Sequence, residues 1–329
     1  MRIYGHIKMK NQIEKIGKEV IDLQIKALKK LKNSLNTSFK DAVNKIYKCK
    51  SKVIICGVGK SGKIASKISA TLSSVGTPSF SISANDCSHG DLGRITPQDI
   101  LILISYSGNT DELKNIIKFS KINKIFLIGI VSNKKSYLYK TSNIKLLTPE
   151  VQESGHGIVP TSSTTTQLSL GDALAIALMK KKKFGKLDFK KYHPAGNLGN
   201  ILKTAGDIML KNEKIPFIDE NEIMKIALKE LNLKKLGFLV LIDKTKRVTG
   251  IFTDGDLKRL MQKKRVIGNL IIKKFASKKP FFVEKDKLAS EVLIEMNNKR
   301  ITNVCVYDKQ DKKKIIGIIH IHTLLKALR

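Results

Sequence analysis

The most constraining feature of this sequence is a run of five apolar residues that ends abruptly in a hydroxyl-rich turn. Ile100 to Ile104 contains no polar residue, which is typical of a strand buried on both faces of a parallel sheet. Ser105, Ser107 and Thr110 follow, and the pattern from Asp111 to Ser120 predicts a helix. Backbone N–H groups at a helix start are unpaired and carry the positive end of the dipole, so this turn predicts a phosphate site. An ordinary turn capped by Thr110 would explain the same residues.

A second strand-to-helix turn lies earlier in the chain. Val53 to Cys56 predicts a buried strand, and three glycines in residues 57–62 lead into a helix. The spacing resembles a dinucleotide fingerprint, but the next expected strand, Ser79 to Ser83, ends in no acidic residue, and the spacing is not that of a Walker A loop. Lys60 and Ser61 stand at the helix start, where an ammonium group could neutralise a developing oxyanion. An ordinary surface lysine is the alternative interpretation of Lys60.

The segments after Ser105 continue to alternate between strands and helices. Ile125–Val131 and Ile144–Leu147 predict two further strands. The alternation predicts an α/β domain with a doubly wound, flavodoxin-like parallel sheet, whose ligands bind beyond the carboxyl ends of the strands. Ahead of the sheet, apolar residues recur at helical spacing from Ile13 to Leu31 and from Phe39 to Ile46. They predict two helices that pack on the sheet or on another subunit rather than reading DNA.

Two later stretches carry further candidate site residues. Thr161 to Thr166 places six hydroxyl residues in succession at the start of a predicted helix. A cap needs only one hydroxyl, so we interpret this cluster as a second ligand contact. Glu153 lies in an irregular loop just before it. His193 precedes a proline in a glycine-rich loop, which disfavours helical geometry there, and it is a candidate acid–base group.

Composition restricts the class of protein. The 329 residues have a formal net charge of +34, yet only seven of the 62 basic residues are Arg, Trp is absent, and Lys is spread along the whole length. Nucleic-acid surfaces usually use Arg forks and aromatic stacking, so we expect no specific nucleic-acid partner. No apolar run approaches the roughly 20 residues that span a bilayer, and no signal-peptide core is visible, so we expect a cytoplasmic protein. The four cysteines lack paired spacing, which is typical of reduced thiols.

The C-terminal part of the chain contains an internal repeat. Its two halves, residues 204–262 and 268–329, each follow a predicted order of helix, strand, strand and helix. Leu239–Ile242 and Asn303–Tyr307 are the predicted central strands. The order indicates a tandem α+β module after the α/β domain.

Five motifs, in this order, resemble those of the sugar isomerase (SIS) domain: Gly57–Gly62, Ser88–Gly93, Ser105–Glu112, Pro160–Ala173 and His193–Gly199. The repeat that follows resembles a tandem pair of CBS domains, and the whole chain resembles the arabinose-5-phosphate isomerase family. The resemblance implies four segments: N-terminal helices packed on the SIS domain (1–48), the SIS domain (49–200), a first CBS domain (204–262) and a second one (268–329). It also implies reversible conversion of D-ribulose 5-phosphate to D-arabinose 5-phosphate through an enediolate, for the Kdo branch of lipopolysaccharide synthesis.

The resemblance further implies the roles of individual residues. It gives four catalytic positions: Lys60, Glu112, Glu153 and His193. We expect Glu153 or His193 to act as the base, with the other assisting ring opening or proton shuttling. Lys60 would stabilise the developing negative charge, and Glu112 would organise the site by pairing with Lys60. The implied substrate-binding positions are Ser61, Gly76, Thr77, His89, Ser105, Ser107, Thr110, Ser162, Ser163 and Thr164.

No cofactor is required for the implied reaction, although a divalent metal in a structural or inhibitory role is left open. Relatives often carry a histidine six residues before His89, and this chain has Ser83 there. A metal site shared by two histidines is therefore not expected, while His89 alone stays a candidate for metal or substrate contact. The resemblance also implies a homotetramer in which His193 is lent to a neighbouring site.

The CBS resemblance implies a nucleotide contact at Thr253 and Asp256. In the second half, His320 and Thr323 occupy the matching places, which puts a second ribose contact in doubt. Three rival functions remain open at this stage. They are an SIS isomerase acting on another sugar phosphate, a non-catalytic phosphosugar-sensing regulator, and a nucleic-acid binder supported only by charge.

Overall fold

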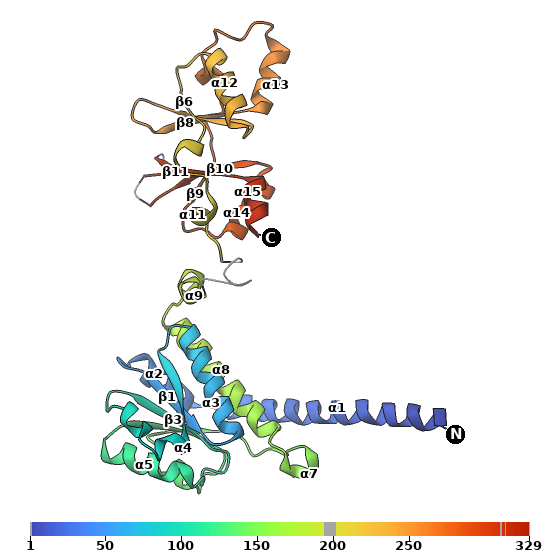
Figure 1. The fold of residues 1–329 in the computed structure, drawn as a ribbon, viewed down its shortest axis with the longest axis vertical. Coiled ribbons are helices and arrows are strands. Elements are labelled where there is room, and N and C mark those ends of the chain that lie inside the picture. The colour runs from blue at the N-terminus through green and yellow to red at the C-terminus, as the bar shows by residue number, and fades with distance from the viewer. Residues whose placement is uncertain (1, 194–201, 310, 313, 329) are drawn as a thin grey trace. The chain divides into compact units, whose positions relative to one another are not determined.

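The computed structural model describes residues 2–193, 202–309, 311–312 and 314–328 (Figure 1). It separates into two compact units, the first ending at Phe189 and the second beginning at Lys190. Each unit has hydrophobic cores of its own. Among the helices that are described, none combines the length and the apolar character needed to cross a membrane.

The first unit is built on a five-stranded parallel sheet with the strand order β2-β1-β3-β4-β5. Its strands are β1 (Val53–Gly57), β2 (Ser79–Ser83), β3 (Ile100–Ile104), β4 (Phe126–Val131) and β5 (Ile144–Leu147). The predicted doubly wound sheet is confirmed, and each strand lies within one residue of its predicted bounds. The order reverses between β1 and β3, which is the place where sheets of this class bind ligands.

Helices cover both faces of this sheet because successive side chains of a buried strand point in opposite directions. Ile100, Ile102 and Ile104 of β3 pack in one core with residues of α1, α2, α3 and α8. Leu101 and Leu103 pack in the other core, with residues of α4, α5 and α6. The helices are α1 (Arg2–Ser34), α2 (Thr37–Tyr47), α3 (Lys60–Ser74), α4 (Ala84–Cys87), η1 (Asp91–Arg94), α5 (Glu112–Ile122), α6 (Tyr137–Thr141), α7 (Gly155–Ile158), α8 (Ser162–Lys181) and α9 (Lys186–Tyr192).

The two N-terminal helices form as predicted, with a break after Ser34. Asn36 caps α2, because its side chain accepts a hydrogen bond from the backbone N–H of Ser38 at 2.9 Å. The C-terminal part of α1 buries Ala27 and Leu31 and runs against α8. Farther toward its N-terminus the apolar stripe lies open: Ile13 is 67% exposed.

The second unit contains two similar three-stranded sheets, with the strand orders β6-β7-β8 and β11-β10-β9. In each sheet the middle strand pairs parallel with one neighbour and antiparallel with the other, so the predicted repeat is confirmed. The sequence interpretation missed the short first strand of each half, β6 and β9. The elements are α11 (Ala205–Ile208), η2 (Asn212–Lys214), β6 (Phe217–Asp219), α12 (Met224–Lys234), β7 (Phe238–Ile242), β8 (Val248–Thr253), α13 (Asp254–Lys263), η3 (Ile272–Lys274), β9 (Phe282–Glu284), α14 (Ala289–Lys299), β10 (Asn303–Tyr307), β11 (Ile315–His320) and α15 (Ile321–Leu328).

The two halves exchange their opening segments. The backbone N–H of Ala205 donates to Lys287 O at 2.7 Å, so α11, predicted to open the first half, packs in the core of the second. Conversely, Ile251 of the first half pairs with Ser277, which lies in the opening segment of the second half. The predicted boundary at residue 204 therefore marks where the sequence repeat begins. It does not separate two independently packed halves, because each half packs against the opening segment of the other.

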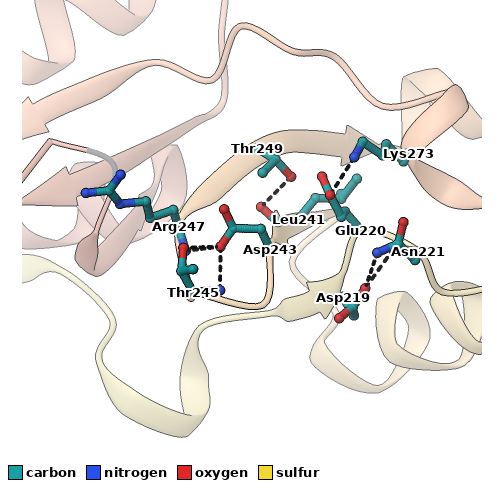
Figure 2. Close-up of polar contacts among 9 residues, drawn as sticks. All are labelled: Asp219, Glu220, Asn221, Leu241, Asp243, Thr245, Arg247, Thr249 and Lys273. Atoms are coloured by element: carbon teal, nitrogen blue, oxygen red, sulfur yellow. Dashed lines mark hydrogen bonds and ion pairs between the residues drawn. The ribbon is translucent and has the colours of Figure 1, made fainter.

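Figure 2 shows how the opening segment of the second half is held on the first half. Glu220 follows β6 and is 8% exposed, and its Oε1 accepts a hydrogen bond from Lys273 Nζ at 2.5 Å. Hydrogen bonds from Lys273 and Thr249 lower the pKa of Glu220 below its ordinary value, although burial opposes them. The nearby turn is closed by Asp243, whose Oδ1 accepts from Thr245 Oγ1 at 2.7 Å.

Candidate active site

Most of the sequence-predicted site residues in the first unit lie at one rim of the sheet. The strands are parallel and nearly in register, with Gly57 of β1 paired to both Ser83 and Ile104. Every loop that leaves a carboxyl end therefore reaches the same edge. These loops carry Lys60, Ser61, His89, Ser105, Ser107, Thr110, Glu112, Glu153, Ser162, Ser163 and Thr164.

The loop after β3 is a closed ring of hydroxyl and backbone groups. Ser105 Oγ lies 2.7 Å from Thr110 Oγ1 and accepts a hydrogen bond from the N–H of Gly108 at 2.9 Å. Ser107 Oγ accepts one from the N–H of Asn109 at 3.3 Å. The N–H groups of Thr110 and the two residues after it donate to no other described residue. These N–H groups indicate an anion-binding site at the start of α5.

This loop is fixed from behind by α6. Gly108 has a φ of +71°, and its carbonyl accepts a hydrogen bond from the N–H of Leu138 at 3.0 Å. A Cβ atom at Gly108 would lie 2.2 Å from Ser136 Oγ, so only glycine fits. Asn109 Oδ1 accepts a hydrogen bond from the N–H of Tyr137 at 2.9 Å. The loop is thus held in shape without a ligand.

The start of α3 places a cation at the same rim. Lys60 is the exposed first residue of this helix, where the dipole disfavours a positive charge unless an anion is present. Glu112 is likewise exposed at the start of α5. The two side chains form no ion pair in the part of the chain that is described, so the expected Lys60–Glu112 contact is corrected. Ser61 Oγ donates instead to Gln167 Oε1 of α8 at 3.2 Å, a contact that the sequence did not reveal.

Glu153 caps α8. Its Oε2 accepts hydrogen bonds from the N–H groups of Thr161 and Ser162, each at 2.8 Å, and its Oε1 accepts one from the N–H of Ser163 at 3.2 Å. Burial raises the pKa of Glu153, but hydrogen bonds from Ser163, Thr161 and Ser162 outweigh burial and hold the pKa below its ordinary value. The carboxylate is therefore ionised and firmly held, and these N–H groups cannot bind a phosphate at the same time.

The hydroxyl cluster at the start of α8 divides into two sets. Thr164 Oγ1 donates to Thr161 O at 2.9 Å, as a local cap does. Ser162 and Ser163 are buried, and Ser162 Oγ has no hydrogen-bond partner in the described ranges; the same holds for Ser154 Oγ. Buried hydroxyls are usually bonded, so these two hydroxyl groups are candidates for ligand contact.

Two predicted substrate-binding residues lie elsewhere. Gly76 and Thr77 come after the C-terminal end of α3 and before β2, which places them at the opposite edge of the sheet from Ser105. There Lys182 Nζ donates to Gly76 O at 2.7 Å and to Thr77 Oγ1 at 2.8 Å. Within one chain a helix of 15 residues separates them from Lys60, and their role in substrate binding stays a prediction.

The residues offer little for a metal. His89 is exposed in the loop after α4, and Ser83 accepts a hydrogen bond from the N–H of Asp86 as the cap of that helix. Across the described residues, no group of three or more His, Cys, Asp or Glu side chains is placed to hold a metal ion. His193 follows α9 and counts with the second unit, and residues 194–199 of its predicted loop lie outside the described ranges.

A separate cavity of about 550 Å³ lies in the second unit and is lined by both halves. Thr253 and Asp256 line it, but they bond one another: Asp256 Oδ2 accepts from Thr253 Oγ1 at 2.7 Å, and Arg259 pairs with the same carboxylate. The further cationic lining residues are Lys279 and Arg300, and they lie with His320, whose pKa burial lowers below its ordinary value. Asn303 Oδ1, also on its wall, has no partner among the described atoms, whereas Thr323 does not line the cavity.

This chain is similar to known proteins over most of its length. The SIS domain pattern matches residues 45–177, and the CBS domain pattern matches residues 205–263 and 272–329. The chain is 38% identical over 316 residues to the arabinose 5-phosphate isomerase KdsD of Yersinia pestis, covering 95% of each protein. The chain belongs to the arabinose 5-phosphate isomerase family. The family member from Escherichia coli (strain K12) is 37% identical over the same length.

A solved structure is also similar to part of this chain. This structure, of an E. coli CFT073 protein in complex with arabinose 5-phosphate, shares 35% identity with a TM-score of 0.55. The match covers 56% of this chain and 98% of that one. The family's SIS domain followed by tandem CBS domains is thus the architecture of this chain, as the sequence predicted.

Proposed function

We propose that this member of the family interconverts D-ribulose 5-phosphate and D-arabinose 5-phosphate. The observation that carries the proposal is the rim of the first unit, where a preformed Ser/Thr loop, the N–H groups at the start of α5 and Lys60 lie on adjoining strand ends. Such a loop suits a phosphate, and an ammonium group beside it suits an enediolate. The reaction needs no external oxidant or reductant, because C1 is oxidised as C2 is reduced while one proton passes from C1 to C2 and another from O1 to O2.

The hydrogen bonds and the lowered pKa of Glu153 decide which residue we propose as the proton carrier. A carboxylate that accepts hydrogen bonds from three backbone N–H groups has few lone pairs left, and its lowered pKa makes it a weak base. We therefore assign the transfer to His193, with Glu153 as a positioning residue; the family resemblance, not geometry, brings His193 to the same reaction.

Deuterium exchange tests both statements. Purified full-length protein is mixed with ribulose 5-phosphate in deuterated water, and deuterium at C2 of the product is followed. Exchange by the wild type is expected, and its absence would remove the isomerase proposal. His193→Asn should lower exchange by about 10²-fold or more, the usual contribution of a positioned base, while Glu153→Gln should lower it less. The reverse order would make Glu153 the carrier.

The proposal also includes the oligomeric state of the enzyme. The open isoleucine stripe of α1 favours a homo-oligomer, and the resemblance specifies a tetramer. Light scattering should give four times the 36.7 kDa chain mass, and a monomer would contradict this.

We also propose a cytoplasmic enzyme of the Kdo branch that needs no metal, so treatment with EDTA should leave its activity unchanged.

The cavity of the second unit supports a regulatory nucleotide site. Its Arg and Lys side chains favour an anionic ligand, and the unpartnered Asn303 Oδ1 can accept a hydrogen bond from a ribose hydroxyl or a base. Addition of AMP or ATP should raise the melting temperature. Lys279→Ala should weaken this shift, and Lys278→Ala, on an exposed neighbour that does not line the cavity, should not.

A further inference from the structure

A second cavity in the first unit adjoins the predicted phosphate loop. It has a volume of about 820 Å³ and opens at the carboxyl ends of β3, β4 and β5. Tyr106 and Ser107 form one side, residues 132–135 a second, and residues 147–151 the third. The volume is typical of pockets that hold small molecules. Ser107 belongs to both this pocket and the phosphate loop, so the two are continuous.

Two hydroxyl groups in this pocket lack partners. Ser132 is 7% exposed and Thr148 is 1% exposed, and neither hydroxyl forms a hydrogen bond with any described residue. The pairing of Val131 with Leu147 places these two residues side by side, each directly after its strand. An unsatisfied buried hydroxyl is costly and rare, and two together in one pocket call for a ligand that bonds them.

The charge around the pocket indicates the class of ligand. Lys134 and Lys135 line the pocket together with one acidic residue, Glu150, and neither ammonium group pairs with an acidic side chain in the described chain. The opposite wall is held in place by Tyr106, whose hydroxyl accepts a hydrogen bond from the N–H of Val151 at 3.0 Å. A polyhydroxylated anion forms hydrogen bonds with the two unpartnered hydroxyl groups and ion pairs with the lysine side chains.

We propose that Ser132 and Thr148 bind hydroxyl groups of the sugar chain while its phosphate lies on the neighbouring loop, and that they thereby select the substrate. The inference rests on the proposed function and deepens it. A site built to bond a substrate hydroxyl rejects analogues that lack it, because its own buried groups then stay unpaired. These positions would separate this substrate from other sugar phosphates, which a phosphate loop alone does not distinguish.

Binding measurements on the full chain test this without relying on turnover. The affinity for arabinose 5-phosphate and for inorganic phosphate is measured by calorimetry, together with the melting temperature of the ligand-free protein. Thr148→Val should weaken arabinose 5-phosphate binding by about 3- to 10-fold, the worth of one neutral hydrogen bond, and leave phosphate binding unchanged. Thr148→Ser should restore binding, and Ser132→Ala should resemble Thr148→Val.

Stability provides a second readout. Because the Thr148 hydroxyl has no partner among the described residues, Thr148→Val should not lower the melting temperature of the free protein. Ser120→Ala is the matched control: Ser120 is also buried, but its Oγ donates to Ile117 O at 2.8 Å within α5. That variant should melt earlier and bind both ligands normally.

The outcomes separate this inference from the proposed reaction. Unchanged sugar-phosphate affinity in Thr148→Val, or an equal loss for inorganic phosphate, would overturn the assignment of the hydroxyl groups. A wild type that binds arabinose 5-phosphate in the expected pattern but exchanges no deuterium would retain the pocket and reject the reaction. A wild type that binds neither ligand would reject the pocket.

Discussion

The carboxylate of Glu153 accepts a hydrogen bond from the backbone N–H of Ser162 at 2.8 Å, and this contact joins the loop after β5 to the start of α8. Thr161 donates to the same oxygen at 2.8 Å. The charge of Glu153 thus complements the positive end of a 20-residue helix. A residue that the family resemblance assigns to chemistry therefore also holds the rim together.

Glu153→Gln should destabilise the first unit by about 1–2 kcal/mol, because the amide keeps one acceptor and loses the charge at the helix start. The folded pKa of Glu153 lies below its ordinary value of 4.5, so the stabilisation is complete above that value and is lost as the pH falls through the folded pKa. Urea titrations from about pH 3 to 7 measure both effects. Glu150→Gln, on an exposed neighbour, is the control, and equal loss in both variants would contradict the capping role.

Gly108→Ala should damage the phosphate loop. The new Cβ would lie 2.2 Å from Ser136 Oγ and 2.5 Å from Val131 Cγ2, so the loop must move or α6 must shift. We expect the affinity for inorganic phosphate to fall at least about tenfold and stability to fall by about 1–3 kcal/mol. Gly59→Ala is the matched comparison, since Gly59 also has a positive φ but has open space around it. Calorimetry that found equal phosphate affinity in Gly108→Ala would place the anion elsewhere.

Thr77→Val should lower stability and leave catalysis unchanged. Its hydroxyl accepts a hydrogen bond from Lys182, and burial lowers the pKa of that lysine, so removal of the acceptor should cost about 1 kcal/mol. Because Thr77 lies at the edge of the sheet opposite Ser105, the KM for ribulose 5-phosphate should not change. A raised KM at full stability would show that Thr77 reaches a substrate, through a neighbouring subunit for example.

Asp99→Asn should be the most destabilising of these changes, by about 3 kcal/mol, because it breaks a buried charged network. Asp99 accepts hydrogen bonds from Ser51 Oγ at 2.6 Å and from the N–H of Thr96 at 2.7 Å, and it pairs with Lys52. Burial raises the pKa of Asp99, but these hydrogen bonds hold it below its ordinary value of 3.8. Its stabilisation is thus present above pH 3.8 and lost below the folded pKa, and the variant should lose this acid dependence. Thermal melts at several pH values test the expectation.

Local patterns in the sequence were sufficient for the strands and for the edge where the site lies. Ile100–Ile104 predicted a buried strand because a run without polar residues can only be covered on both faces, and the structure shows it so. Strand-to-helix turns at 57–62 and 105–112 then had to share one edge, because parallel strands end together. The short strands β6 and β9 were not predicted from the sequence, because three residues are too few to show an alternating pattern.

Side-chain partners across the sheet could not be predicted in the same way. Nothing local to Glu153 shows that it caps α8, and nothing local to Ser132 or Thr148 shows that their hydroxyls lack partners among the described residues. These relationships depend on which strands are neighbours and on their register. The sequence by itself determined the α/β order, the repeat and the hydroxyl-rich turns, because each depends on residues close in the chain. Only the tertiary structure decided which of these side chains bond one another and which remain open to a ligand, because contacts between residues distant in the chain are fixed by packing.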